Sequence, residues 1–498
     1  MMHLVYIFIY REDGMVALPI DERRKMPASR PGLRRSIPNG AVVPASVEGR
    51  FRRIKWHVLT ICLLVYYAVP FLRWDRGPGQ PLQAVLFDVE RVRFYLFGIE
   101  IWPQELYYLT LLLVLATVVL VLMNALAGRI WCGFACPQTV WSDLFMLVER
   151  WIEGDRRERL RKMYEPKTPR RIAEIGLKHI AWLLIASATG GAFILYFADA
   201  PTLLVEVFTG EASTAAYAVI LSLTFTTYAL AGFAREKVCT FMCPWPRLQG
   251  AIWDPEALTV NYRDHRGEER MSVKKAKAAR EAGLPAGDCV DCAACVNVCP
   301  MGIDIREGPS IACINCGLCV DACDDTMGKI GRERGLIDYE SWTNIERGRR
   351  SEPRRRVRLV RPKTMALATA ALVLLAVPGL SLGTRATMAM SVSHVRNPSA
   401  VLLSNGDIRN AYEVRLVNKS GEARTVHLSS PEGTVLEVPG YAAVEDETVP
   451  LELGADASQK VRVLVTASES SEGEIAFTLS DTTTGETVRE TNLFHRPR

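Results

Sequence analysis

Five long apolar runs set the hydropathy pattern of the chain, and charge-rich stretches separate them. This patterning is typical of a membrane protein rather than of one soluble core. Each run is long enough to cross about 30 Å of hydrocarbon at about 1.5 Å per residue of helix. The runs are Ile54–Leu72, Leu106–Ala127, Ile175–Phe197, Ala215–Phe233 and Thr364–Leu382. The pattern therefore predicts an α-helical membrane domain with five spans.

Lys and Arg residues predict the orientation of these spans. They crowd the segments before the first span, between the second and third, and before the fifth, whereas residues 198–214 contain neither. The basic residues include Arg23, Arg24, Lys25, Arg50, Arg52, Arg53, Lys55, Arg150, Arg156, Arg157, Arg159, Arg161, Lys162, Arg354, Arg355, Arg356, Arg358, Arg361 and Lys363. Because positively charged loops stay in the cytoplasm, we expect a cytoplasmic N-terminus and a periplasmic C-terminus in a bacterial inner membrane.

Short alternating segments replace the long runs after residue 384. Tyr412–Val417 and Val461–Val465 alternate apolar with polar residues, and turn residues such as Asn405–Gly406 separate such segments. Alternation at this spacing favours an immunoglobulin-like β-sandwich. Between the fourth and fifth spans, the Ala- and Lys-rich stretch Glu268–Glu281 predicts a helix.

These patterns predict a multidomain membrane protein. The expected parts are a cytoplasmic N-terminal segment (1–53), a four-span membrane domain (54–253), a cytoplasmic cysteine-rich module (254–363), the fifth span (364–382) and a periplasmic sandwich (383–498). The module is assigned to the cytoplasm because it lies between spans four and five.

Twelve of the 13 cysteines lie in four tight groups, which favours metal ligation over a disulfide framework. Eight form two C-x-x-C-x-x-C-x-x-x-C runs, as in two-cluster bacterial ferredoxins, where the fourth ligand of each cluster comes from the other run. Residues 254–363 are therefore expected to form a ferredoxin-like module with two [4Fe–4S] clusters. Cluster one is assigned to Cys289, Cys292, Cys295 and Cys323, and cluster two to Cys313, Cys316, Cys319 and Cys299. Zinc sites are the alternative, but their C-x-x-C pairs usually lie further apart. With all irons saturated by thiolates, such clusters only relay electrons.

Four further cysteines form two C-x-x-x-C-P pairs. Cys132 and Cys136 follow the second span, Cys239 and Cys243 follow the fourth, and Ala-Leu-Ala-Gly precedes each pair as part of an internal repeat. In a helix, cysteines at i and i+4 face the same side, so the repeat can bring four thiolates to one membrane face. Soft thiolates favour Cu(I) and can reduce Cu(II) or hold a further cluster. Helix packing and a simple disulfide are the alternatives.

Histidine and methionine residues offer additional ligands. His57 and His179 begin the two hairpins at similar depth, where a nitrogen ligand and an interfacial side chain are equally good interpretations. Met242 can offer a thioether, although packing explains it better.

Two groups of residues lie outside these pairs. Met388, Met390 and His394 follow the fifth span and could contact copper, although a flexible linker into the sandwich is the simpler interpretation. Cys62, inside the first apolar run, is interpreted as a small buried hydrophobe.

The ordered set of motifs resembles the FixG/RdxA/CcoG proteins, accessory factors for cbb-type cytochrome oxidase. The resemblance runs from about Gly49 to the end of the chain. The matching stretches include Gly49–Trp56, Leu96–Gly98, Trp102–Gln104, Trp131–Trp141, Glu149–Gly154, Cys239–Pro244, Gly302–Arg306, Gly335–Tyr339, Arg396–Pro398 and Ile408–Tyr412. Met301, Trp245–Pro246 and His394 depart from the family pattern, but none of them removes a ligand.

The resemblance implies a role in assembling the oxidase by reducing Cu(II) to Cu(I), which would make the protein an oxidoreductase. Copper delivery by thiolate carriers requires Cu(I), and a low-potential cluster can supply the single electron. The expected partners are the lipid bilayer, oxidase subunits or copper carriers, and an unknown cytoplasmic electron donor, with no nucleic acid; a homodimer is one assembly to consider. The alternatives are a quinol-linked electron conduit, similar to NapH-like proteins, and a non-enzymatic assembly scaffold.

Overall fold

The computed structural model describes residues 6–11, 14–19, 42–77, 80–166, 168–430, 433–441, 448–468 and 473–496. The basic residues Arg23, Arg24 and Lys25 lie outside these ranges. The chain divides into two compact units. Unit 1 is Met1–Leu59, Ala127–Ala186 and Thr226–Val357, and unit 2 is Thr60–Leu126, Ser187–Phe225 and Arg358–Arg498.

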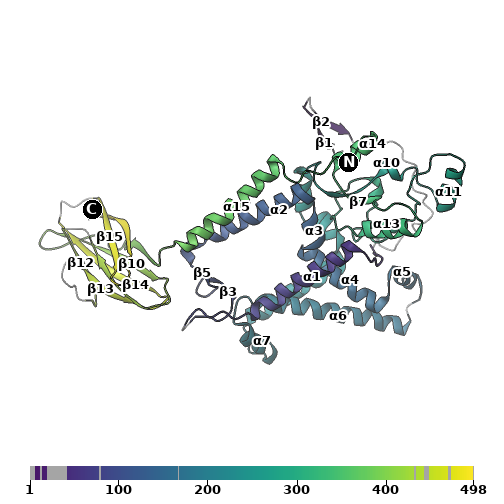
Figure 1. The fold of residues 1–498 in the computed structure, drawn as a ribbon. Coiled ribbons are helices and arrows are strands. Elements are labelled where there is room, and N and C mark those ends of the chain that lie inside the picture. Colours follow the sequence, from purple (N-terminus) through teal and green to yellow (C-terminus); the bar gives the residue numbers. More distant parts are fainter. Residues whose placement is uncertain are drawn as a thin grey trace. The chain divides into compact units, whose positions relative to one another are not determined.

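Five helices among the described residues are long and apolar enough to cross a membrane (Figure 1). They are Arg50–Phe71 (α1, Arg50–Ala68, with the 3₁₀ turn η3, Val69–Phe71), Tyr107–Ala127 (α2), Pro169–Ile194 (α6), Thr214–Ala234 (α8, Thr214–Thr227, with the π-helix η5, Tyr228–Ala234) and Pro362–Gly383 (α15). Five helices able to span a membrane thus lie where the sequence predicts the five spans. Helix α6 begins before the predicted Ile175, because a proline suits the first turn of a helix.

Shorter helices fill the rest of unit 1. They are α3 (Ile130–Phe134), α4 (Pro137–Glu153), α5 (Arg156–Tyr164), η6 (Val238–Met242), α9 (Trp245–Ala251), α10 (Asp264–Gly267), α11 (Val273–Glu281), α12 (Ala294–Asn297), η7 (Ile305–Glu307), α13 (Leu318–Lys329) and α14 (Trp342–Arg349). Antiparallel β6 (Thr259–Tyr262) pairs with β7 (Ile337–Glu340), and β1 (Tyr6–Arg11) pairs with β2 (Gly14–Pro19).

The predicted helix Glu268–Glu281 begins only at Val273, so its first turn is wrong. The Glu268 carboxylate accepts hydrogen bonds from the Tyr262 hydroxyl at 3.1 Å and from the backbone N–H of Arg270 at 3.2 Å. These contacts hold residues 268–272 in a loop against β6, and Ser272 becomes the N-cap.

Unit 2 contains a small antiparallel sheet of β3 (Val85–Asp88), β4 (Arg93–Leu96) and β5 (Ile99–Ile101), the 3₁₀ turn η4 (Pro103–Glu105) and the apolar helix α7 (Ala200–Thr209). Its C-terminal part forms two further sheets. One has the order β12-β14-β10-β8, with β9 paired to β10, and the other β13-β11-β15-β16. The strands are β8 (Met388–His394), β9 (Val401–Leu402), β10 (Ile408–Asn418), β11 (Arg424–Ser429), β12 (Thr434–Glu437), β13 (Val449–Leu453), β14 (Ser458–Ala467), β15 (Gly473–Asp481) and β16 (Thr487–Phe494).

Side chains from both of these sheets form one hydrophobic core. In β10 the residues Tyr412, Val414 and Leu416 are fully buried while Glu413 and Arg415 are exposed, as the alternating pattern predicts. The interpretation of residues 388–394 as a flexible linker is wrong. Met388 and Met390 lie on β8 and enter this core, because alternate residues of a strand face the same side.

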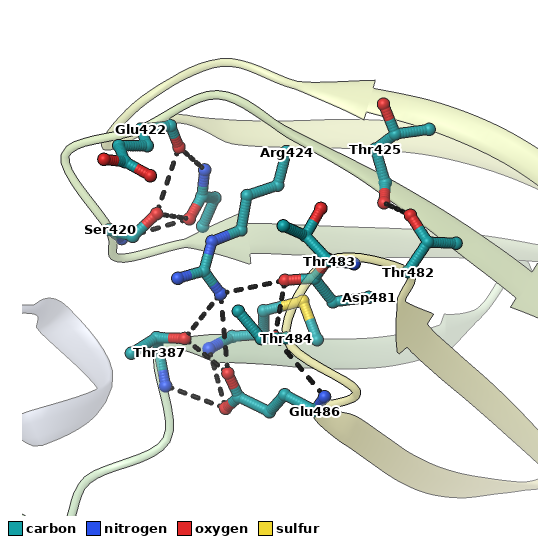
Figure 2. A network of polar contacts seen from close by, with 12 residues as sticks. Thr387, Ser420, Glu422, Arg424, Thr425, Asp481, Thr482, Thr483, Thr484 and Glu486 are labelled. Carbon is teal, nitrogen blue, oxygen red and sulfur yellow. Dashed lines mark hydrogen bonds and ion pairs between the residues drawn. The ribbon is translucent and has the colours of Figure 1, made fainter.

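A polar network fixes the start of β8 (Figure 2). The Arg424 guanidinium donates to the Thr387 hydroxyl at 2.8 Å and to the Asp481 carboxylate at 3.1 Å. Glu486 accepts a hydrogen bond from the backbone N–H of Thr387 at 2.8 Å. The network thus ties the residue before β8 to the turn between β15 and β16.

Candidate metal centre

Two cavities in unit 1 divide the eight ferredoxin-type cysteines. Cavity one is lined by Cys289, Cys292, Cys295 and Cys323, together with apolar residues such as Met327 and Leu336. These are the four cysteines that the spacing assigns to cluster one. Cys289 and Cys292 lie on a loop, Cys295 lies on α12 and Cys323 on α13.

Cavity two is lined by Cys299, Cys313, Cys316 and Cys319, the four cysteines assigned to cluster two, and Cys295 reaches it from the neighbouring cavity. Its other walls are apolar and include Val260, Ile303 and Ile314. The crossed arrangement arises because Cys299 and Cys323 each lie four positions beyond the third cysteine of their run, which carries each of them to the other cavity.

The donor sets of both cavities fit a metal–sulfur group. All eight thiols are free, and burial raises the pKa of Cys295, Cys313 and Cys323 to about 12. A buried thiol loses its proton readily only when a cation takes the proton's place, and the thiolate is the metal ligand. Four soft sulfur ligands around an apolar cavity suit an iron–sulfur cluster better than a hard ion.

The two C-x-x-x-C-P pairs do not lie on single helices, so the expectation of two helical i, i+4 pairs is wrong. Cys132 lies on α3 and Cys239 on η6, but Cys136 and Cys243 have extended backbones with ψ of 131° and 124°. The reason is the proline that follows each second cysteine, which disfavours the helical conformation of the residue before it.

The four paired cysteines are nevertheless brought together, and we call them the thiol group. Burial raises the pKa of Cys132 to about 12, and the charges of Cys136, Cys239 and Cys243 add to this rise while Arg129 opposes it. Burial likewise raises the pKa of Cys239 to about 11, with further contributions from Cys136 and Cys243. These mutual electrostatic effects place all four sulfur atoms in one neighbourhood.

Helix α3 packs against the loop that carries the ligands of cavity two. A Cβ atom on Gly133 would lie 2.5 Å from the carbonyl oxygen of Ile314, so only glycine permits this approach. The Arg129 guanidinium donates to the carbonyl oxygens of Ile311 and, at 2.6 Å, Pro246. Cys132 packs in the same hydrophobic cluster as Cys316. We call this contact the α3 junction.

The first membrane helix also meets the module, through its N-terminal turn. The Asp321 carboxylate accepts hydrogen bonds from the backbone N–H groups of Phe51, at 3.2 Å, and Arg52, at 2.8 Å. Asp321 lies on α13, between Cys319 and Cys323. A carboxylate at this position satisfies free N–H groups of the helix and favours its dipole.

A buried ion-pair group that the sequence analysis missed lies beside cavity two. Arg52 Nη1 and Lys55 Nζ lie 3.1 Å and 3.2 Å from the same oxygen, Oδ2 of Asp143 on α4. Arg52 and Lys55 were interpreted only as orientation signals at the membrane surface. The spacing of Asp143 within α4, on a face of buried residues, was the available signal for a buried charge.

The two candidate histidines are placed differently. His57 is an exposed residue of α1. Nδ1 of His179 and the Tyr228 hydroxyl form a hydrogen bond of 3.0 Å, and the His179 ring stacks on the Phe233 ring. These contacts favour a packing role for His179, and ligation by either histidine stays a prediction.

Of the remaining sulfur and imidazole candidates, Met242 lies within the second cysteine pair, and the others lie further away along the chain. Met242 is 63% exposed, and Cys62 is half-buried on α1. On β8, the His394 ring bonds the Asn410 side chain at 2.9 Å and lies 4.3 Å, centroid to centroid, from that of His495.

Comparisons with known proteins agree with this arrangement. Residues 234–342 match the family model of a 4Fe-4S dicluster domain, residues 108–154 that of a 4Fe-4S binding domain, and residues 379–497 that of the IG-like fold at the C-terminus of FixG. Together with five helices able to span a membrane, these matches define a membrane protein that carries iron–sulfur clusters.

Three relatives match most of the chain. RdxB and RdxA of Cereibacter sphaeroides are 45% and 47% identical, over 91% and 87% of this chain and 96% and 91% of their own lengths. The nitrogen fixation protein FixG of Rhizobium meliloti is 43% identical over 85% of this chain and 86% of its own. The chain therefore belongs to the FixG/RdxA/RdxB family, which confirms the resemblance noted in the sequence.

Proposed function

We propose that the protein passes single electrons through the eight ferredoxin-type cysteines to the thiol group, where Cu(II) is reduced to Cu(I) for insertion into a cbb-type cytochrome oxidase. The [4Fe–4S] clusters, when bound in cavities one and two, supply a one-electron relay. Each electron reduces one Cu(II) ion, so the step needs no proton and breaks no covalent bond. We place the thiol group and the module on the cytoplasmic side of a bacterial inner membrane, with the C-terminal sheets in the periplasm.

The α3 junction carries this proposal. Gly133 lies between the two cysteines of the first pair and lets α3 approach the backbone of Ile314, which separates two ligands of cavity two. Cys132 shares a hydrophobic cluster with Cys316. Short, packed contact between the relay and the thiol group is what electron transfer between them requires.

The thiol group has the chemistry to hold the product ion. Thiolates are soft ligands and favour Cu(I) over Cu(II). Cys136 precedes the first turn of α4, and the backbone N–H groups of Gln138 and Thr139 offset part of the burial that raises the pKa of its thiol. This position prepares Cys136 to become a thiolate when a cation arrives.

Copper reduction by the anaerobically purified full-length protein tests the proposal. The protein is reduced, freed of excess reductant and mixed with Cu(II) in the presence of a chromogenic Cu(I) chelator. We expect Cu(I) in proportion to the reduced clusters, and at least about a tenfold slower reaction in Cys132→Ser and Cys239→Ser. Cys62→Ser, a cysteine outside the thiol group, is the matched control and should react normally.

The same preparation separates the alternatives. Reoxidation by a quinone analogue with no response to Cu(II) would replace copper reduction by a quinol-linked conduit. Normal oxidase assembly in cells whose protein lacks all eight ferredoxin-type cysteines would replace it by a scaffold role.

A further inference from the structure

The ion-pair group beside cavity two carries an excess of positive charge. Arg52 and Lys55 are 6% and 2% exposed, and both pair with the one carboxylate of Asp143, itself 2% exposed. Burial raises the pKa of Asp143, but Lys55 and Arg52 outweigh it and hold this pKa below its usual range, so the carboxylate is ionised at neutral pH. Two buried cations thus share a single carboxylate. Burying such a group is costly, which points to a role other than stability.

This charge acts directly on the ligands of cavity two. Lys55 and Asp143 line a further cavity together with Pro300, which follows Cys299, and Ile314. Burial raises the pKa of the Cys316 thiol, the charge of Lys55 lowers this pKa, and the charge of Asp143 raises it. Arg129 adds a further positive charge near Cys313, while Asp321 adds a carboxylate on α13.

Cavity one has no such buried excess of positive charge. Arg306 lines it and pairs with two carboxylates, Asp304 and Asp291, each at 2.7 Å. Besides burial, the negative charge of Asp324 helps to raise the pKa of the neighbouring Cys323 thiol. Nearby, Asp288 pairs with Arg266 at 2.6 Å and with Arg280 at 2.8 Å, and Arg332 donates a hydrogen bond to its carbonyl oxygen. Around cavity one, cations and carboxylates therefore pair with one another and several of them are exposed, whereas a buried excess of cations remains beside cavity two.

We propose that this asymmetry sets the reduction potential of cluster two above that of cluster one, with Lys55 as the main positioning charge, and so directs electrons from cavity one through cavity two to the thiol group. The inference rests on the proposed function in taking the two cavities as cluster sites and the thiol group as the acceptor of their electrons. Reduction adds a negative charge to a cluster. A neighbouring positive charge in a medium of low dielectric constant stabilises the reduced form, and a negative charge destabilises it.

Redox titration of the reconstituted full-length protein, followed by EPR, tests this inference. Lys55→Met removes the charge but keeps the length of the side chain. We expect this substitution to lower one midpoint potential. A tenfold shift in the reduction equilibrium corresponds to a fall of about 59 mV for a one-electron couple. Asp143→Asn should raise the same midpoint, and Asp304→Asn should raise the other one. Arg53→Met, which removes an exposed charge from the same helix, should move neither.

Lys55→Met and Asp143→Asn are expected to shift the same midpoint potential in opposite directions. Damage to the fold gives no reason for such opposite shifts, so their signs identify an electrostatic effect. Iron content measured for each variant shows whether the clusters assemble. Lys55→Arg should keep the wild-type midpoints, and Asp143→Asn provides the test if Lys55→Met does not bind iron. Unchanged midpoints in iron-replete Lys55→Met, or shifts of equal sign in Lys55→Met and Asp143→Asn, would overturn the inference. Absence of any iron–sulfur signal in the wild type would instead overturn the proposed function.

Discussion

Cavity one and cavity two hold the same number of assigned cysteines, yet their surroundings differ. Of the eight ferredoxin-type cysteines, Cys292 in cavity one is the exposed one. Cavity two is flanked by α3 through Gly133 and by the first turn of α1 through the residues around Lys55. Two similar ligand runs thus acquire different neighbours. The proposed function would have electrons enter at cavity one and leave from cavity two for the thiol group.

The largest expected effect comes from removing a ligand from one cavity at a time. Cys316→Ser should cost about half of the bound iron and slow Cu(II) reduction by at least about tenfold, because cavity two adjoins the thiol group. Cys292→Ser should cost a similar amount of iron. It should still reduce copper when a small chemical reductant is used, since such a reductant does not need cavity one. Iron analysis and the chelator assay measure both variants. Equal loss of copper reduction in the two would remove the distinction between the cavities.

A smaller effect is expected at the α3 junction. Gly133→Ala places a Cβ atom 2.5 Å from the carbonyl oxygen of Ile314, so α3 must move away from the loop. We expect a destabilisation of about 1–3 kcal/mol and slower copper reduction with normal iron content. Gly176→Ala on α6, where a Cβ atom meets nothing within 4 Å, is the matched control. If Gly133→Ala reduced copper at the wild-type rate, the junction would not be the electron path.

The smallest effect is expected where α1 meets α13. Asp321→Ala removes the carboxylate that accepts the N–H groups of Phe51 and Arg52. Loss of such a cap costs about 0.5–2 kcal/mol, so the thermal unfolding midpoint should fall. Asp325→Ala, on the same helix and paired with Lys329 at the surface, should change it little. Equal midpoints for the two variants would show that the cap does not fasten the module to α1.

Much of this architecture follows from the sequence alone. Hydropathy located the five long helices, because a bilayer requires about 20 apolar residues in succession. Cysteine spacing divided the eight cysteines into the same two sets that line cavities one and two, because residues on short loops have little freedom in where they point. The alternating pattern of β10 likewise identified its buried face.

Other features depend on tertiary contacts that no local pattern encodes. Lys55 reads as a surface charge in the sequence, but it is buried because Asp143, from a distant helix, pairs with it. Met388 and Met390 follow a span directly, and only the pairing of β8 with β10 makes them core residues.

The bend at Cys136, by contrast, could have been predicted from Pro137, because a proline disfavours the helical conformation of the residue before it.

The most direct test of the account is an iron, sulfide and zinc analysis of the anaerobically purified full-length protein, combined with EPR after reduction. The account predicts about eight iron and eight sulfide per chain for two [4Fe–4S] clusters, and the signals of two interacting one-electron centres. A reduced sample that contains zinc in place of iron and gives no EPR signal would contradict it.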